Sequence, residues 1–323
     1  MKRVFVLGVV VSAGVLAMAA AGLSAQQPAG QGAAPAGQGR GEGRGDGRGR
    51  GPGFPPVTSI EKVANNLYMV PGQGGNTAAF VTAKGVVLVD TKLANNGQAI
   101  LDQVKTVTDK PVTHIINTHT HGDHTGSNDF FPASVEIVTQ ENTKANMEKM
   151  DAFKDPAKKH GLADRTFGDR MTLLSGNESI DLYYFGPAHT NGDAFVVFRE
   201  ARVMHAGDVF AGKGQPFIDG NNGGSGIAYG ATIGKAAAGI KNVDTVIPGH
   251  SPVTKWQDFV DFGEFNRLYL DQARAALKGG QTAEQALASL KLPEKFKEYN
   301  LQGGRGGPGG NFNVIFEELK KQP

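Results

Sequence analysis

The chain has 323 residues, of which 39% are hydrophobic and 8% aromatic, enough to bury a substantial core. It contains no cysteine, which excludes disulfides and thiolate metal ligands, so any metal site must use imidazole and carboxylate groups. The net charge is +2; Lys2 and Arg3 account for +2 and residues 26–56 for another +2, which leaves a slightly acidic body at −2 and predicts no nucleic-acid partner.

The first residues have the charge and hydrophobicity pattern of an export signal. A basic pair, Lys2 and Arg3, precedes an uncharged apolar run, and small residues follow up to Ala25. This order predicts a cleavable signal peptide over residues 1–25 and a periplasmic or secreted protein. The competing interpretation is a transmembrane anchor, because the run is near the lower length limit for spanning a bilayer. Glycines within the run and the polar stretch after it disfavour a stable membrane anchor.

Residues 26–56 are rich in Gln, Pro, Ala and then Gly-Arg repeats. Such a segment buries too little apolar surface to offset its ordering entropy, which predicts a disordered Gly/Arg/Pro-rich linker. The alternative is an arm that binds RNA or an acidic surface. A flexible tether is favoured for an exported chain, because RNA is scarce outside the cytoplasm. The globular domain is expected at 57–300, and a Gly-rich C-terminal tail with a short terminal segment at 301–323.

The first half of the globular region predicts a strand–helix–strand unit. Val86–Val89 is a continuous apolar run that stops at Asp90, as a strand buried on both faces should. The apolar spacing between Ala94 and Thr106 is that of one helix face. In such a unit, ligands fall at the carboxyl ends of the strands. Further strands are predicted at 66–70, 78–82 and 112–116.

The second half again predicts strands and helices, on either side of a glycine-rich loop at 212–230. As a hypothesis, this loop borders the substrate pocket, with Phe217, Asn221 and Tyr229 as contacts; the alternative is a loose surface loop. Strands are predicted at 135–138, 171–174, 179–185, 194–198, 202–205 and 244–247, and helices at 231–240, 256–277 and 282–290.

Three histidines and an aspartate lie close together after the strand predicted at 112–116: His119, His121, Asp123 and His124. Imidazole and carboxylate are common zinc ligands. On a turn after a strand, His119 and His121 can point to one side while Asp123 and His124 reach a neighbouring point, which suits two adjacent ions. An exposed polar run is the alternative, disfavoured because the chain has only 8 histidines.

The segment from His119 to His124 resembles the HxHxDH motif of the metallo-β-lactamase superfamily. Further motifs of that family follow in order, each at the end of a predicted strand, and the resemblance covers about residues 60–255: Gly186–Asp193, His205–Asp208 and Ile247–His250. The resemblance implies an α/β fold, a metallo-β-lactamase-like αββα sandwich with two mixed sheets packed face to face and helices outside.

The resemblance also implies a ligand set for two zinc ions per chain, with Fe or Mn not excluded. The first ion would take His119, His121 and His189. The second would take Asp123, His124 and His250, with Asp208 bridging both. The candidate catalytic residues are Asp123, which would orient a hydroxide, and His119, His121 and Asp208.

The remaining polar candidates have plainer interpretations. His114 is expected to be structural, His160 to lie on the surface, and His205 to stand behind the ligands at most. Asp90 resembles the carboxylate that supports a ligand in this family, and a helix N-cap is an equal alternative.

The resemblance implies an exported zinc-dependent metallo-hydrolase acting on a small-molecule substrate. A metal-bridging hydroxide would hydrolyse an ester, lactone, thioester or amide-type bond. One alternative is class B-like β-lactamase activity, although a bridging Asp208 resembles the glyoxalase II and lactonase branches more. A mono-iron persulfide dioxygenase-like oxidoreductase is the second alternative, disfavoured by His124 and His250. A metal-stabilised binding protein without turnover is the third. The oligomeric state and the exact substrate stay open.

Overall fold

The computed structural model describes residues 53–301 and 308–322. The predicted signal peptide and the predicted linker up to residue 52 lie outside the described residues, so both stay predictions. No helix in the described ranges combines the length and the apolar character that crossing a bilayer requires.

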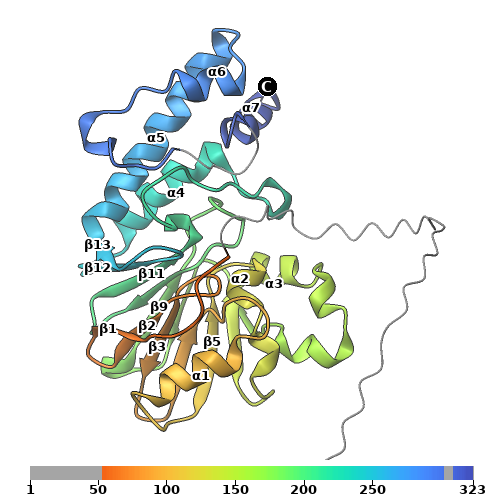
Figure 1. The fold of residues 1–323 in the computed structure, drawn as a ribbon, viewed down its shortest axis with the longest axis vertical. Helices are drawn as coiled ribbons and strands as arrows, with labels where there is room; N and C mark the ends of the chain where they lie inside the picture. Colours follow the sequence, from red (N-terminus) through yellow and green to blue (C-terminus); the bar gives the residue numbers. More distant parts are fainter. Residues whose placement is uncertain (1–52, 302–307, 323) are drawn as a thin grey trace, which may run out of the picture. The chain divides into compact units, whose positions relative to one another are not determined.

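The described strands form two mixed sheets (Figure 1). The first has the order β1-β2-β3-β4-β5-β6-β7, antiparallel from β1 to β4 and parallel from β4 to β7. Its strands are β1 (Glu61–Ala64), β2 (Leu67–Val70), β3 (Thr77–Val81), β4 (Val86–Val89), β5 (Val112–Asn117), β6 (Glu136–Gln140) and β7 (Arg165–Phe167).

The second sheet has the order β13-β12-β11-β10-β9-β8, with β11 and β12 as its parallel pair. Its strands are β8 (Arg170–Leu173), β9 (Ile180–Tyr183), β10 (Phe195–Phe198), β11 (Val203–Gly207), β12 (Thr245–Pro248) and β13 (Thr254–Lys255).

The two sheets pack face to face through alternate side chains of their strands. Phe80 on β3 meets Phe198 on β10, with ring centroids 5.2 Å apart, inside a shared cluster of buried residues. The side chains between them on each strand point outward. Ala79 and Leu88 thus pack against the helix α1 (Gly97–Lys105).

Helices cover the outer face of the second sheet as well (Figure 1). The helices α4 (Gly226–Gly239) and α5 (Trp256–Lys278) pack on it, with Tyr229 and Phe262 in the same cluster as Phe195 of β10. The predicted αββα sandwich is therefore confirmed. Shorter helices complete the described part: α2 (Gly122–Thr125), α3 (Glu141–Met147), α6 (Ala283–Ala288) and α7 (Phe312–Lys320).

Nearly all predicted elements are confirmed to within three residues at either end. The start of the helix predicted at 231–240 was wrong, since α4 begins at Gly226, where the hydroxyl of the N-cap Ser225 accepts from the amide of Ala228. Glycine disfavours helix, which hid this start. The packing explains Gly230: a Cβ there would lie 2.8 Å from Cγ of Arg267 on α5.

Helix α7 was not predicted as a helix of the core, because the sequence before it is glycine-rich. Its apolar face contacts α4, α5 and α6, and Phe312, Ile315 and Phe316 are buried. The ring of Phe312 stacks on Tyr269 of α5, with centroids 4.2 Å apart.

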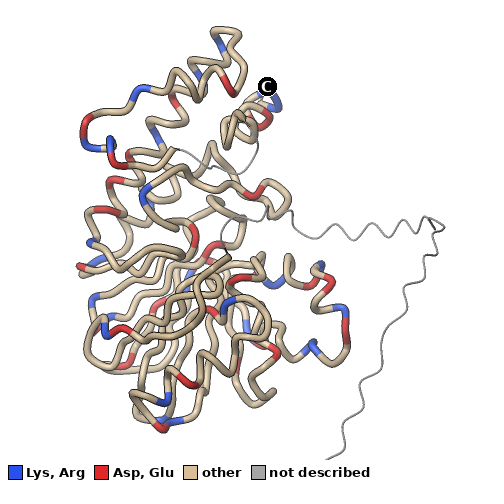
Figure 2. The backbone as a smooth tube through the Cα atoms, in the orientation of Figure 1, with Lys and Arg blue, Asp and Glu red and all other residues tan. Residues whose placement is uncertain are grey.

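Lys and Arg are interspersed with Asp and Glu along the described chain (Figure 2). Opposite charges pair across the surface in many places, such as Arg202 with Asp244 and Lys213 with Asp258. The absence of a nucleic-acid partner stays a prediction from the sequence.

We predict that Phe312→Ala destabilises the protein by about 3–5 kcal/mol, because it removes a fully buried ring and leaves a cavity. Urea denaturation of the full chain measures this free energy. Lys320→Ala on the exposed side of α7 is the control and should change it by less than about 0.5 kcal/mol. Equal stability of Phe312→Ala and the wild type would show that α7 contributes nothing to the core.

Candidate metal centre

The carboxyl ends of several strands bring the predicted ligands to one edge of the sandwich. His119 and His121 follow β5, and the short helix α2 carries Asp123 and His124. Asp208 follows β11, whose last residue Gly207 has φ +50°. A Cβ on Gly207 would lie 2.7 Å from the Thr118 hydroxyl, so glycine allows the two sheets to approach here.

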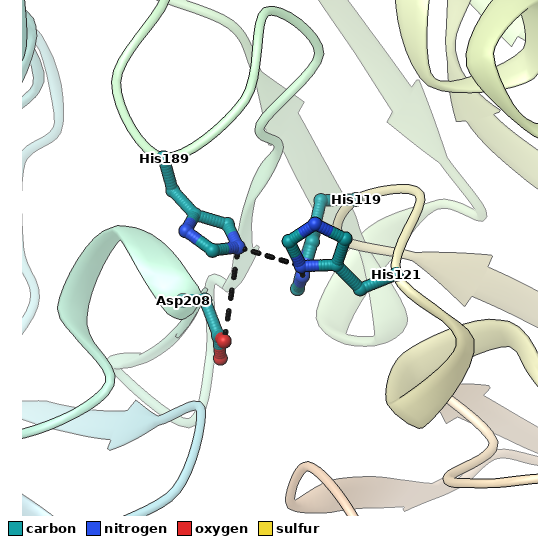
Figure 3. Close-up of side chains that lie close together, drawn as sticks. All are labelled: His119, His121, His189 and Asp208. Carbon is teal, nitrogen blue, oxygen red and sulfur yellow. Dashed lines mark hydrogen bonds and ion pairs between the residues drawn. The ribbon is translucent and has the colours of Figure 1, made fainter. Parts of the chain in front are cut away.

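The first group consists of His119, His121, His189 and Asp208 (Figure 3). One ligand atom from each lies within 4.8 Å of the others. His121 Nδ1 is 3.2 Å from His119 Nε2 and 2.9 Å from His189 Nε2. His119 and His121 reach this point from the one segment after β5, whereas His189 and Asp208 come from two other parts of the chain (Figure 3).

The second group consists of Asp123, His124 and His250, again with ligand atoms within 4.8 Å of one another. His124 Nε2 lies 3.3 Å from His250 Nε2, which is 3.4 Å from an Asp123 carboxylate oxygen. The structure thus brings all seven predicted ligands together.

Asp208 lies between the two groups. Its Oδ1 is 3.2 Å from His124 Nε2, and its Oδ2 is 3.2 Å from His250 Nε2 and 3.8 Å from His189 Nε2. The Oδ1 atom is buried and accepts no well-directed hydrogen bond within the described ranges. A buried carboxylate oxygen in this position fits a shared metal ligand.

In each histidine of the first group, the ring nitrogen that points away from the other ligands donates a hydrogen bond. His189 Nδ1 donates to the Phe217 carbonyl at 2.7 Å, and His121 Nε2 donates to Asp219 at 2.7 Å. His119 Nδ1 donates to the Thr118 hydroxyl at 3.0 Å, since that hydroxyl itself donates to a carboxylate. Each ring therefore turns its other nitrogen, with a free lone pair, toward the first group.

Asp90 at the end of β4 supports the second group. It accepts from His124 Nδ1 at 2.7 Å, from the Thr118 amide at 2.8 Å and from the Thr118 hydroxyl at 2.7 Å. The N-cap of α1 is Asn96, so the alternative role of Asp90 as a helix cap was wrong. Asp90 adopts φ +64°, an uncommon conformation for a residue with a Cβ, which aims its carboxylate at both partners.

Lone pairs that face one another at these distances repel unless a cation lies between them. Nitrogens around a tetrahedral zinc at about 2.0–2.1 Å are about 3.3 Å apart, close to the spacings of both groups. The donor set contains imidazole and carboxylate only, as zinc accepts. The residues present therefore fit a pair of divalent ions, and their assignment as zinc ligands stays a prediction.

The pKa shifts of the buried histidines differ between the two groups. Burial lowers the pKa of His119 well below its ordinary value, and the neighbouring His124 and His189 lower it further. Burial lowers the pKa of His189 to about 4. Burial also lowers the pKa of His124, but Asp208 and Asp90 raise it more, so it lies well above the ordinary value. A proton and a metal ion thus compete for the Nε2 atom of His124.

The other histidines lie outside both groups. His114 on β5 is half-buried and contacts Glu136 at 3.3 Å, and the exposed His160 contacts the Asp129 carbonyl. His205 is buried and donates from Nε2 to the Asn76 carbonyl at 3.0 Å.

Tyr229 does not contact a substrate pocket, contrary to expectation. It is 1% exposed, and its hydroxyl donates to the main-chain carbonyls of Asp208 and Val209. The reason is the early start of α4, which turns this side chain into the core. Phe217 does lie beside the metal-ligand rings, 5.2 Å from His189 and 5.8 Å from His121.

Two residues at the site were missed. Asp219, which holds His121, was not singled out, although it is the one acidic residue of the loop 212–226. Phe54 was assigned to the linker, yet its ring stacks on His250 with centroids 5.6 Å apart. Local sequence carries no signal for the contact of Phe54 with His250, because 196 positions separate them.

Comparison with known proteins agrees with this geometry. Residues 70–250 match the model of the metallo-beta-lactamase superfamily, which spans more than half of the chain. The chain belongs to this superfamily, and the site defines it as a metallo-hydrolase with a dinuclear-type metal centre.

Individual relatives are distant. A type 2 metallo-beta-lactamase from Bacillus sp. (strain 170) is 26% identical over 183 residues, which cover 55% of this chain and 67% of the relative. The crystal structure of the DIM-1 metallo-beta-lactamase has a TM-score of 0.55 at 18% identity and covers 66% of this chain and 98% of its own. The structure of the sec-alkylsulfatase Pisa1 from Pseudomonas sp. has a TM-score of 0.69 at 13% identity. The match covers 80% of this chain and 50% of the sulfatase chain. At these identities the two structures support the fold alone.

We predict that Asp90→Asn weakens zinc binding by about ten- to hundredfold, because the amide cannot hold His124 in its ligating tautomer as the carboxylate does. Competition with a zinc-binding dye measures the affinity. Asp102→Asn on the exposed face of α1 is the matched control and should bind zinc like the wild type. Unchanged affinity in Asp90→Asn would separate Asp90 from the metal centre.

Proposed function

We propose that this protein is an exported, zinc-dependent hydrolase that cleaves an ester, lactone, thioester or amide-type bond of a small molecule. The observation that supports it most is the position of Asp208, whose two oxygens face both groups of ligands. As a ligand shared by both ions, Asp208 would hold them close enough to act on one bond. When bound, two zinc ions lower the pKa of water to about 7 and polarise the oxygen of the scissile group.

The chain's own residues position the reactants. Asp123 is buried beside His250, and its carboxylate accepts a hydrogen bond from the attacking water and orients it. Asp219 and Asp90 fix the rings of His121 and His124 from behind. Asn76 donates to the carbonyls of Pro248 and Ser251, which fixes the loop on either side of His250. Such a rigid frame reduces the reorganisation that the reaction requires.

Class B-like β-lactamase activity is the second candidate, and the likeness to the Bacillus type 2 metallo-beta-lactamase favours it. A mono-iron persulfide dioxygenase-like activity is the third. The complete second group of Asp123, His124 and His250 supports a two-metal hydrolase over that reaction. Export rests on the signal-like pattern of residues 1–25 alone and stays a prediction.

We predict that protein dialysed against zinc retains about two zinc ions per chain, measured by elemental analysis. Such protein should hydrolyse esters or lactones in a panel that also contains thioesters, amides, phosphodiesters and β-lactams.

Asp208→Ala should lower kcat/KM at least about hundredfold, because the shared ligand is lost. Dialysis against a chelator should abolish turnover, and zinc should restore it.

His114→Ala is the matched control for Asp208→Ala, because His114 lies on β5 and contacts Glu136 rather than the metal-ligand groups. It should keep kcat/KM within about twofold of the wild type. A chain with two zinc ions that cleaves nothing in the panel would contradict the proposed reaction. About one iron per chain together with oxygen uptake on a persulfide would favour the dioxygenase.

A further inference from the structure

Phe54, just before β1, lies against His250 of the second group of metal ligands. Phe54 is half-buried, and its ring is nearly parallel to that of His250, with an interplanar angle of 18°. Two hydrogen bonds from Gln73 hold the segment 53–56: its amide donates to the Pro55 carbonyl at 2.8 Å, and its side chain donates to the Phe54 carbonyl at 2.9 Å. Phe54 is therefore placed by main-chain contacts that do not depend on its side chain.

A cavity of about 220 Å³ lies between this segment and the loops after β2 and β12. Its wall is mainly apolar, and Glu61 contributes its one carboxylate. His250 belongs both to this wall and to the second metal-ligand group, so the cavity adjoins the reacting centre. The apolar part of the wall includes Phe54, Pro55, Met69, Pro71 and Pro252.

The size of the cavity limits what it can hold. Pockets for whole drug-sized ligands measure about 300–1,000 Å³. A cavity of about 220 Å³ instead suits one substituent, such as a short alkyl chain or a single ring. Its apolar wall gains free energy from covering alkyl or aryl surface, and Glu61 disfavours an anionic group.

A second aromatic side chain stands beside the first group. The half-buried ring of Phe217 lies 5.2 Å from the ring of His189, while the Phe217 carbonyl accepts from the same histidine. Each group of metal ligands thus has one partly exposed phenylalanine against it. Phe54 is supplied by the residues before β1 and Phe217 by the loop before α4.

We propose that Phe54 and the cavity beside it form a substrate subsite for an uncharged alkyl or aryl substituent next to the scissile bond. The proposal rests on the proposed hydrolase function and narrows its substrate to esters or lactones with an apolar arm. Residues 53–56 are then part of the active site and determine its specificity. Phe217 bounds the same site on the side of the first group.

The test is the affinity of the zinc-loaded full chain for acetohydroxamate and hexanohydroxamate, which share a zinc-binding head and differ in alkyl length. Calorimetry should show that the wild type binds the longer probe roughly tenfold more tightly, because the open cavity covers part of its longer chain. Phe54→Gln should reduce this ratio to about twofold, since it replaces the aromatic part of the apolar wall with a polar side chain. Phe54→Leu should keep most of it, because the wall stays apolar.

Phe130→Gln is the matched control: Phe130 is 43% exposed and contacts Phe131 and Gly97 instead of the metal-ligand rings, so the ratio should stay near tenfold. Folding of each variant is checked by thermal unfolding and its zinc content by elemental analysis. If Phe54→Gln does not fold, Phe54→Ala takes its place with the same expected ratio.

A folded, zinc-replete Phe54→Gln that keeps the tenfold ratio overturns the subsite. The experiment distinguishes failure of the proposed hydrolase reaction from failure of the subsite. If the zinc-loaded wild type shows the ratio, and Phe54→Gln loses it, but no ester or lactone is hydrolysed, the subsite is supported and the reaction is wrong. The same variants assayed on acetate and hexanoate esters should lose selectivity through KM for the hexanoate ester, with little change in kcat.

Discussion

The inward-facing lone pairs of the histidines and the buried carboxylate of Asp208 are the constraint on which the rest of the site depends. Brought to about 3 Å from one another in a largely buried site, such groups repel unless cations lie between them. The outward hydrogen bonds of His121 to Asp219 and of His189 to the Phe217 carbonyl keep the rings from turning away. Holding these groups together costs folding free energy, and bound cations would offset that cost, as they do in metal centres.

The sandwich fold brings these ligands together from distant parts of the chain. Parallel strand pairs in both sheets end at the same edge, so the residues after β5, β11 and β12 meet there. Small residues permit the approach: a Cβ on Gly249 would lie 2.0 Å from Asp208 Oδ1, and one on Gly207 would meet Thr118. Rigid strands on both sides then fix the spacing of the ligands, which sets how two ions can share one substrate.

The sequence allowed the sandwich and the ligands to be predicted because their signals are local. Apolar runs ending in polar residues identify the strands, and the cluster from His119 to His124 lies within one turn. The remaining features depend on tertiary contacts. Tyr229 was misassigned because glycines concealed the first turn of α4, and α7 follows a glycine-rich stretch that gives no helical signal. Phe54 meets His250 only in the folded chain, where Gln73 fixes the backbone of its segment.

The most direct measurement is anomalous diffraction at the zinc absorption edge from crystals of the zinc-loaded full chain. The account predicts two peaks about 3.5–4 Å apart, with Asp208 between them. One peak should lie among His119, His121 and His189, and the other among Asp123, His124 and His250. A single peak, or ions bound elsewhere while these side chains keep their places, would contradict it.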